Sequence, residues 1–316
     1  MNFKQVARAL LLFFLGLPAA LPAAPLAYVP NEKAGTLSVI DTADQRVVAA
    51  IPAGKRPRGI AADPAGKRLY VTDAANRELL VIELAGRSIV QRIPLGDSPE
   101  GVSISADGRW LAAAVEGNNS VVLLDAASGK REAEIRVHGK NPEHAVFSPD
   151  GRWLYVSAEE AEQVDVIDVA ARQQVGSIPV GRRPRGIAFL PDGSRAYVAC
   201  ELSNMVYAID VASRQAVAEI RAGQFANGVA ITPDGKRVFV SNGKDGTVSA
   251  IDSASNAVLA TIEVGKRPWN MAVTPDGRLL YVANGRSNSV SVIDTAALRK
   301  LADVPVGELP WGVVIP

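Results

Sequence analysis

The sequence has few of the residues that metal and redox chemistry require. Its 316 residues include one cysteine, Cys200, and two histidines, His138 and His144. A single cysteine excludes an intrachain disulfide framework and a cysteine-rich zinc site, and two histidines argue against a histidine-rich metal centre. Aromatic residues make up only 5%, and Lys+Arg 34 against Asp+Glu 33 leaves a formal net charge of +1. This balance argues against a polycationic nucleic-acid-binding chain and against an acidic disordered tail.

Residues 1–24 are predicted to be a secretory signal peptide. Two basic residues precede an apolar stretch, Leu10–Leu17, and small residues follow up to Ala24, which is the order of a signal sequence. The alternative is a membrane-spanning anchor, which needs about 20 apolar residues, whereas Pro18 ends this shorter run. Cleavage near Ala24 would leave residues 25–316 as a periplasmic or secreted protein.

The rest of the chain repeats one motif about every 42 residues. A glycine before a proline-containing loop, called here the marker glycine, recurs at Gly54, Gly96, Gly139, Gly181, Gly223, Gly265 and Gly307. Two independent markers keep the same period: an apolar residue followed by an acidic one, as in Ile40-Asp41, and an aromatic residue, as in Tyr28, for which Ala112 stands in one unit. Self-similarity at this spacing indicates a repeat architecture.

Each unit contains four short strand candidates rich in β-branched and aromatic residues, and no helical periodicity is sustained. Pro-Asp-Gly runs such as Pro149-Asp150-Gly151 predict tight hairpins between the first and second strands. Six complete units run from Gly54 to Val306, residues 26–53 supply three more strands, and Leu309–Ile315 supplies one. We therefore predict an all-β fold, a seven-bladed β-propeller of four-stranded antiparallel blades, closed by combining the C-terminal strand with the N-terminal strands. A parallel β-solenoid has shorter coils and does not predict this shared blade.

Several segments resemble the YVTN-type β-propeller repeat family: Arg68–Asp73 (RLYVTD), Phe239–Asn242 (FVSN) and Leu280–Asn284 (LYVAN), together with the Pro-Asp-Gly turns. Size, unit count and signal sequence are most similar to the exported propellers associated with pyrroloquinoline quinone (PQQ)-dependent alcohol catabolism. The resemblance implies an accessory protein with no established chemistry of its own, whose partners would be a quinoprotein dehydrogenase, a cytochrome c or a transport component. Related propellers include d1-haem-binding proteins. The sequence departs from PQQ dehydrogenases, since it lacks their Trp-docking repeat and their eighth blade, and it has no Cys-x-x-Cys-His motif.

Comparison between the units points to one variable position in each. The fourth residue after the marker glycine follows proline in six units and precedes glycine in five, with His144 and Asn270 replacing that glycine in the other two. This rigid frame leads into the innermost strand, so its variable side chains should surround one mouth of the central channel. They are Arg58, Glu100, Glu143, Arg185, Asn227, Trp269 and Trp311.

The first functional hypothesis is a non-catalytic binding module. Trp269 and Trp311 would stack on a planar anionic ligand such as PQQ or a tetrapyrrole, while arginines of the mouth such as Arg58 would contact its carboxylates. Further positive charge lies nearby on Lys55, Arg56, Arg182, Arg183, Lys266 and Arg267. The alternative interpretation of the same residues is structural: arginines and glutamates pair across the mouth, and the tryptophans fill the channel.

The second hypothesis is enzymatic. Glu100, Glu143 and His144 could provide acid and base groups or bind a metal, as in a lactone hydrolase or an epimerase. His144 could also be an axial ligand of haem. These three residues have no diagnostic spacing.

A third hypothesis, nucleic-acid binding by basic loops and tryptophans, is disfavoured by the near-neutral charge. It is also disfavoured by an acidic sector, which we expect to be solvated surface or a site for a basic partner: Glu116, Glu159, Glu160, Glu162 and Glu201.

Overall fold

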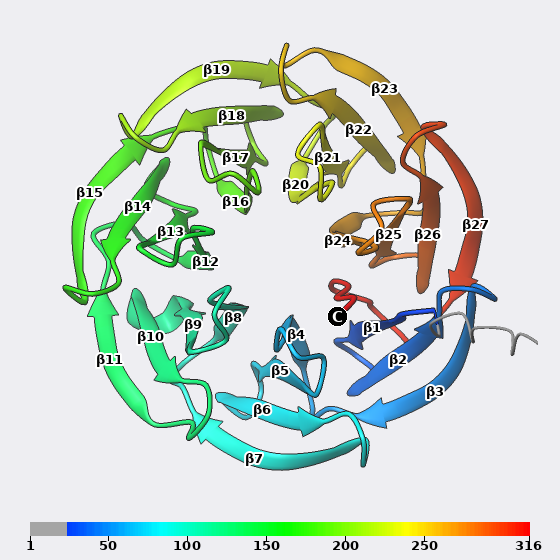
Figure 1. The fold of residues 1–316 in the computed structure, drawn as a ribbon, viewed down its shortest axis with the longest axis horizontal. Helices are drawn as coiled ribbons and strands as arrows, with labels where there is room; N and C mark the ends of the chain where they lie inside the picture. The colour runs from blue at the N-terminus through cyan, green and yellow to red at the C-terminus, as the bar shows by residue number, and fades with distance from the viewer. Residues whose placement is uncertain (1–23) are drawn as a thin grey trace, which may run out of the picture.

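Twenty-seven strands of six or seven residues follow one another in the computed structural model, which describes residues 24–316. Within these residues the only other regular element is one 3-10 turn, η1 (Glu116–Asn118). The strands form seven sheets arranged in a ring around a central axis (Figure 1). The predicted signal peptide falls on residues that, Ala24 apart, lie outside the described part of the chain; it stays a prediction.

Six blades are four-stranded antiparallel sheets whose strands follow in chain order from the axis outward (Figure 1). Blade 1 consists of β4 (Pro57–Ala62), β5 (Arg68–Asp73), β6 (Glu78–Glu83) and β7 (Ser88–Pro94). Blade 2 consists of β8 (Pro99–Ile104), β9 (Trp110–Val115), β10 (Ser120–Asp125) and β11 (Arg131–Arg136). Blade 3 consists of β12 (Pro142–Phe147), β13 (Trp153–Ala158), β14 (Gln163–Asp168) and β15 (Gln173–Pro179).

The chain continues around the ring in the same way. Blade 4 consists of β16 (Pro184–Phe189), β17 (Arg195–Cys200), β18 (Met205–Asp210) and β19 (Gln215–Arg221). Blade 5 consists of β20 (Ala226–Ile231), β21 (Arg237–Asn242), β22 (Thr247–Asp252) and β23 (Val258–Glu263). Blade 6 consists of β24 (Pro268–Val273), β25 (Leu279–Asn284), β26 (Ser289–Asp294) and β27 (Arg299–Pro305).

The seventh blade, called here the closing blade, is shared by the two ends of the described chain. Its three regular strands are β1 (Leu26–Asn31), β2 (Thr36–Asp41) and β3 (Arg46–Pro52). The C-terminal segment lies against β1, where Tyr28 and Val314 exchange both backbone hydrogen bonds at 2.9 and 3.0 Å. Trp311 N–H donates to the carbonyl of Pro30 at 2.9 Å. The predicted seven-bladed propeller and its mode of closure are therefore confirmed, although the last strand is held by only two separate bridges.

The hydrophobic core lies between neighbouring blades. In β5 the five residues after Arg68 are all buried, and in β6 the four central residues are buried as well. Both faces of a blade are covered by other blades, so the middle strands are continuous apolar runs rather than alternating ones. One of seven such clusters joins Tyr70 and Leu79 of blade 1 to Leu111 and Val122 of blade 2.

The marker glycines allow the loop before each inner strand to approach the end of the second strand. Asn242, at the end of β21, accepts a hydrogen bond from the Gly223 N–H at 3.0 Å and donates to Ser249 at 3.0 Å. A Cβ on Gly223 would lie 2.6 Å from the Asn242 side chain. Asn284 is buried in the same position of blade 6. These asparagines are therefore buried caps of the blade.

A second set of glycines brings neighbouring inner strands together. A Cβ on Gly59 of β4 would lie 2.8 Å from the backbone nitrogen of Val102 and 2.9 Å from the Cα of Gly101, both in β8. Gly186 and Gly228 meet the backbone of the following inner strand in the same way. These contacts keep the inner strands close together, and they place the residue before each glycine at the axis.

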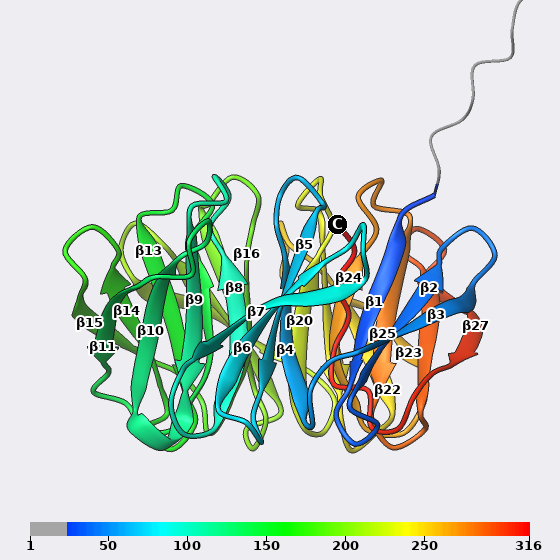
Figure 2. The same ribbon diagram turned by 90° about the horizontal axis from the view of Figure 1, so that it is seen from below.

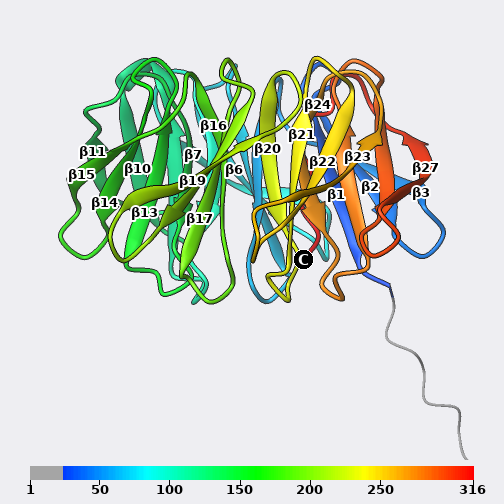
Figure 3. The same cartoon turned by 90° about the horizontal axis from the view of Figure 1, so that it is seen from above.

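The ring has two different ends. The loop face carries the marker glycines and the loops that follow each second strand, and the turn face carries the Pro-Asp-Gly turns. Both ends of residues 24–316 reach the turn face: the Thr42 N–H donates to the carbonyl of Pro25 at 3.4 Å, and Pro316 lies beside Gly66. Side views show β1 and the C-terminus between the neighbouring blades (Figures 2 and 3). Among the described residues, no helix has the length and apolar character needed to cross a membrane.

Candidate functional site

All seven variable residues line one cavity at the axis, on the loop face. The cavity has a volume of about 230 Å³. Its walls include Arg58, Glu100, Glu143, Arg185, Asn227, Trp269 and Trp311. The structure thus brings together the set that comparison of the repeat units indicated. Their role in binding a ligand remains a prediction.

A second ring of residues was missed as a site in the sequence, and three of its members, Glu32, Glu116 and Glu159, line the cavity. The residues of this ring occupy the position directly after the second strand of each blade: Glu32, Ala74, Glu116, Glu159, Glu201, Gly243 and Gly285. Glu159 and Glu201 were interpreted as solvated surface, which was wrong, because they are only 8% and 1% exposed. Glu160 and Glu162 are exposed as expected. The signal was present, since this position varies between units with the same 42-residue period.

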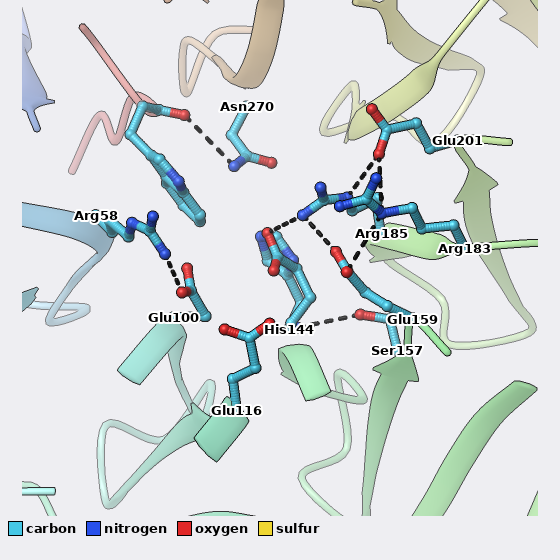
Figure 4. A network of polar contacts seen from close by, with 12 residues as sticks. Arg58, Glu100, Glu116, His144, Ser157, Glu159, Arg183, Arg185, Glu201 and Asn270 are labelled. Carbon is cyan, nitrogen blue, oxygen red and sulfur yellow. Dashed lines mark hydrogen bonds and ion pairs between the residues drawn. The ribbon is translucent and has the colours of Figure 1, made fainter. Parts of the chain in front are cut away.

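Arg58 is held between two acidic residues. Its guanidinium lies 3.1 Å from Glu32 Oε1 and also contacts the carboxylate of Glu100 (Figure 4). Arg56 approaches Glu32 from the outer side at 2.7 Å. Arg58 therefore connects its own blade to the units on both sides, and the buried carboxylate of Glu32 balances its charge.

Arg185 is the centre of a larger cluster on the opposite wall (Figure 4). Its Nη1 lies 2.7 Å from Glu143 and also pairs with Glu159, and its Nε lies 3.0 Å from Glu201. Glu201 in turn holds Arg267 at 2.7 Å. Although burial alone would lower it, the pKa of Arg185 is raised by these three carboxylates. The cluster ties blades 3, 4 and 6 together through charged side chains.

The pKa values of the Glu100 and Glu143 carboxyl groups are shifted in opposite directions. Burial, and next the nearby Glu143 carboxylate, raises the pKa of Glu100 to about 8. Burial would also raise the pKa of Glu143, but Arg185 and then His144 hold it below its ordinary value. At neutral pH one carboxyl of the pair therefore carries a proton and the other is ionised. Burial and the charge of Glu143 likewise raise the pKa of Glu159 to about 7.

The contacts of the Ser98 hydroxyl also indicate that a carboxyl group beside it is protonated. The Ser98 hydroxyl lies 3.2 Å from Glu100 Oε1 and 3.0 Å from Glu116 Oε2. A hydroxyl can donate only one hydrogen bond, so at least one of the two carboxyl groups must donate to Ser98 for both contacts to be hydrogen bonds.

Two aromatic rings from opposite sides of the propeller meet in the channel. The imidazole of His144, from blade 3, stacks on the indole of Trp311, from the closing blade, with 5.5 Å between ring centroids and 21° between planes. Burial lowers the pKa of His144, so the ring is neutral at pH 7, and its buried Nδ1 has no hydrogen-bond partner among residues 24–316. The expectation that tryptophan fills the channel therefore holds for Trp311.

Trp269 lies differently, against the wall of blade 6. A Cβ on Gly285 would lie 2.7 Å from its indole ring, so the absence of a side chain at the second-ring position leaves room for this large aromatic group. Trp269 stays partly exposed to the cavity. It is the aromatic surface on which a ligand could stack.

The remaining candidate residues have no visible role in metal or nucleophilic chemistry. Within residues 24–316, no group of three His, Cys, Asp or Glu residues is placed to hold a metal ion. His138 is exposed and away from the cavity lining. Cys200 is buried in β17, where burial raises the pKa of its thiol to about 12.

The seven blades and the polar cavity on their axis define the class: a seven-bladed β-propeller with an axial cavity. The family model described as "Lactonase, 7-bladed beta-propeller" matches residues 43–178 and 170–308, and the chain belongs to this family. A search of curated proteins gives no match.

Solved structures share the fold. Hydrazine synthase of Kuenenia stuttgartiensis is similar with a TM-score of 0.79 and 22% identity, covering 90% of this chain and 99% of that one. A functionally unknown protein from Desulfotomaculum acetoxidans has a TM-score of 0.81 and 16% identity, covering 92% of this chain and 99% of that one. Likeness at this level of identity concerns the fold alone.

Proposed function

We propose that this protein is an exported, periplasmic binding propeller that holds a small cyclic polar compound in its axial cavity. Its role would be accessory rather than catalytic, as the resemblance to propellers of PQQ-dependent alcohol catabolism implies. A quinoprotein dehydrogenase, a cytochrome c or a transport component would be its partner. The observation that carries the proposal is the convergence of unlike side chains from all seven blades on one cavity.

The cavity is asymmetric in a way that suits a ring-shaped ligand. Trp269 offers a partly exposed indole on one side, and aromatic surfaces bind the faces of planar or cyclic groups. Glu100 and Glu143 offer a hydrogen-bond donor and an acceptor on the other side, because only one of them is ionised at neutral pH. Hydroxyl, carbonyl or ring oxygen atoms would find partners there.

The pairing of the cavity arginines with glutamates changes the kind of ligand that we expect. The four arginines of the cavity wall, Arg58, Arg183, Arg185 and Arg267, are each already paired with a buried glutamate. The part of the ligand inside the cavity should therefore be neutral rather than anionic, since a carboxylate would have to compete with those glutamates. Ligand cavities commonly measure about 300–1,000 Å³, so about 230 Å³ is too small to enclose a tetrapyrrole. PQQ would fit only with its carboxylates outside the cavity.

Ligand binding should quench the fluorescence of Trp269 and should depend on that residue. Titration of the purified protein with γ- and δ-lactones, their hydroxy acids and PQQ is expected to give saturable quenching by at least one of them. Trp269→Ala should weaken that binding by roughly three- to tenfold, the value of a lost aromatic contact. Trp110→Ala, on the turn face, is the matched control and should leave affinity unchanged. Equal weakening by both substitutions, or quenching by none of the compounds, would refute the proposal.

A second candidate function is lactone hydrolysis. It is favoured by the divergent pKa values of Glu100 and Glu143 and by the family match. Ionised Glu143 would take a proton from a water molecule as the water oxygen bonds to the lactone carbonyl carbon. Protonated Glu100 would give its proton to the ring oxygen as the acyl C–O bond breaks, and the product is the hydroxy acid. Pairs of carboxyl groups with divergent pKa values are a common basis for acid and base catalysis.

Hydrolysis by this pair would have a characteristic pH profile. The rate should be constant near neutrality and should fall as pH rises through about 8, because Glu100 then loses the proton it must donate. Glu143→Gln should lower kcat/KM at least about 100-fold, whereas Glu160→Gln, at an exposed carboxyl of the same loop face, should not. A lactone panel assayed by product titration tests this, and the absence of turnover with any lactone would leave only the binding role.

A further inference from the structure

A groove beside the cavity carries the positive charge that the cavity itself lacks. It lies on the loop face over blades 4 to 6 and has a volume of about 630 Å³, within the range of small-molecule sites. Five cationic residues line it: Arg183, Lys244, Lys266, Arg267 and Arg286. Three acidic residues, Glu201, Asp245 and Glu263, also line it, so the groove has an excess of two positive charges.

Three of these cations are not engaged by carboxylates. Within the described residues, Lys244, Lys266 and Arg286 have no acidic group within 4.0 Å, in contrast to every arginine of the cavity wall. All three residues are exposed. Concave surfaces concentrate the field of such charges, so this groove, rather than the cavity, is where an anionic group would gain most.

The groove and the cavity share a wall. Arg183 and Arg267 line both, and Glu201 holds them at 3.4 and 2.7 Å. The guanidinium of Arg267 is fixed further by the Phe225 ring at 5.3 Å and by Gly243, where a Cβ would lie 2.9 Å from its Nη1. A single ligand could therefore reach across this wall.

We propose that the groove is the anion-binding part of the site and takes the carboxylate of a ligand whose ring lies in the cavity. This inference rests on the proposed binding function and specifies its ligand class: a cyclic compound bearing a carboxylate on one side. Arg58 and Arg185 of the cavity are not available for this carboxylate, because each is already paired with a buried glutamate. The binding groups are instead Lys266 and Lys244, which lies 5.6 Å from the Phe225 ring centre, and Arg286 also lines the groove.

Phthalate and its neutral diamide, phthalamide, are matched probes of this arrangement. Isothermal titration calorimetry at fixed pH and salt should show that phthalate binds at least fivefold more tightly than phthalamide. The variant Lys244→Gln with Lys266→Gln should abolish this preference while leaving phthalamide affinity unchanged. The control is Lys55→Gln with Lys140→Gln, which removes the same charge from exposed loop-face positions equivalent to Lys266 in blades 1 and 3, and it should keep the preference.

Each other outcome overturns the inference. Loss of the preference in both double variants would show a general charge effect, and its persistence in both would place the carboxylate elsewhere. Failure of phthalate to bind more tightly than phthalamide would remove the anion site altogether. The cavity proposal is judged separately, since the effect of Trp269→Ala on phthalamide, lactone and quinone binding does not depend on the groove lysines.

Discussion

Removal of Leu309–Pro316 should abolish cooperative folding or lower the melting temperature by at least about 10 °C. The segment supplies the inner strand of the closing blade and buries Trp311 and Val313. Burial of two such side chains contributes about 1.5–3 kcal/mol each, and the backbone hydrogen bonds to Tyr28, Pro30 and Glu32 add about 0.5–1.5 kcal/mol each. The sum is comparable to the whole stability of an ordinary domain. Thermal unfolding followed by circular dichroism measures the change.

The matched control is deletion of Pro316 alone. This residue is exposed at the end of the chain, beyond the last bridge to β1, and its loss should leave the melting temperature unchanged. If the protein lacking Leu309–Pro316 instead melted cooperatively within 3 °C or so of the full chain, a shift that corresponds to only about 1 kcal/mol, the C-terminal segment would not be what closes the ring.

Gly59→Ala should lower the free energy of unfolding by at least about 3 kcal/mol. The added methyl group would collide with the carbonyl of Glu100 and lie 2.8 Å from the Val102 nitrogen, and neither backbone atom can rotate away. Overpacking of this kind typically costs about 1–3 kcal/mol or more, and here it would also separate the inner strands of blades 1 and 2. Denaturant unfolding should show the loss as a lower transition midpoint.

Gly176→Ala is the control for this substitution. Gly176 lies in the outer strand β15, and a Cβ there would meet no atom within 4 Å. Alanine restricts the unfolded chain, so it should be neutral or should stabilise the protein by roughly 0.4–1 kcal/mol. Equal losses for the two variants would contradict the view that glycine at position 59 is required by the neighbouring inner strand.

The fold could be predicted because the residues that determine its loops and turns recur at a fixed spacing in the sequence. The marker glycines, the Ile-Asp pairs and the Pro-Asp-Gly turns each keep the same spacing, and each has a physical reason in the structure. Gly151, for instance, has φ of 69°, and Asp150 accepts a hydrogen bond from the Arg152 N–H at 3.0 Å. These are local requirements, repeated in each blade, so comparison of the units alone identifies them.

The site could be predicted only in part, because its side chains come from different blades and are far apart in the sequence. The position of Arg185 at the axis followed from the frame around it, but its three partners come from two blades and could not be assigned. Glu159 and Glu201 were misjudged because a glutamate in a loop is usually solvated. What buries them is a cluster of arginines that the sequence places up to 66 residues away.

The position of the two chain ends has a practical consequence. Both Pro25 and Pro316 reach the turn face, so a tag or a surface linkage attached at Pro25 of a shortened chain or at Pro316 would leave the opposite opening free. Immobilised protein should therefore remain accessible both to small compounds and to a candidate partner applied in solution. Competition between the two on such a surface would show directly whether they meet at the same end of the ring.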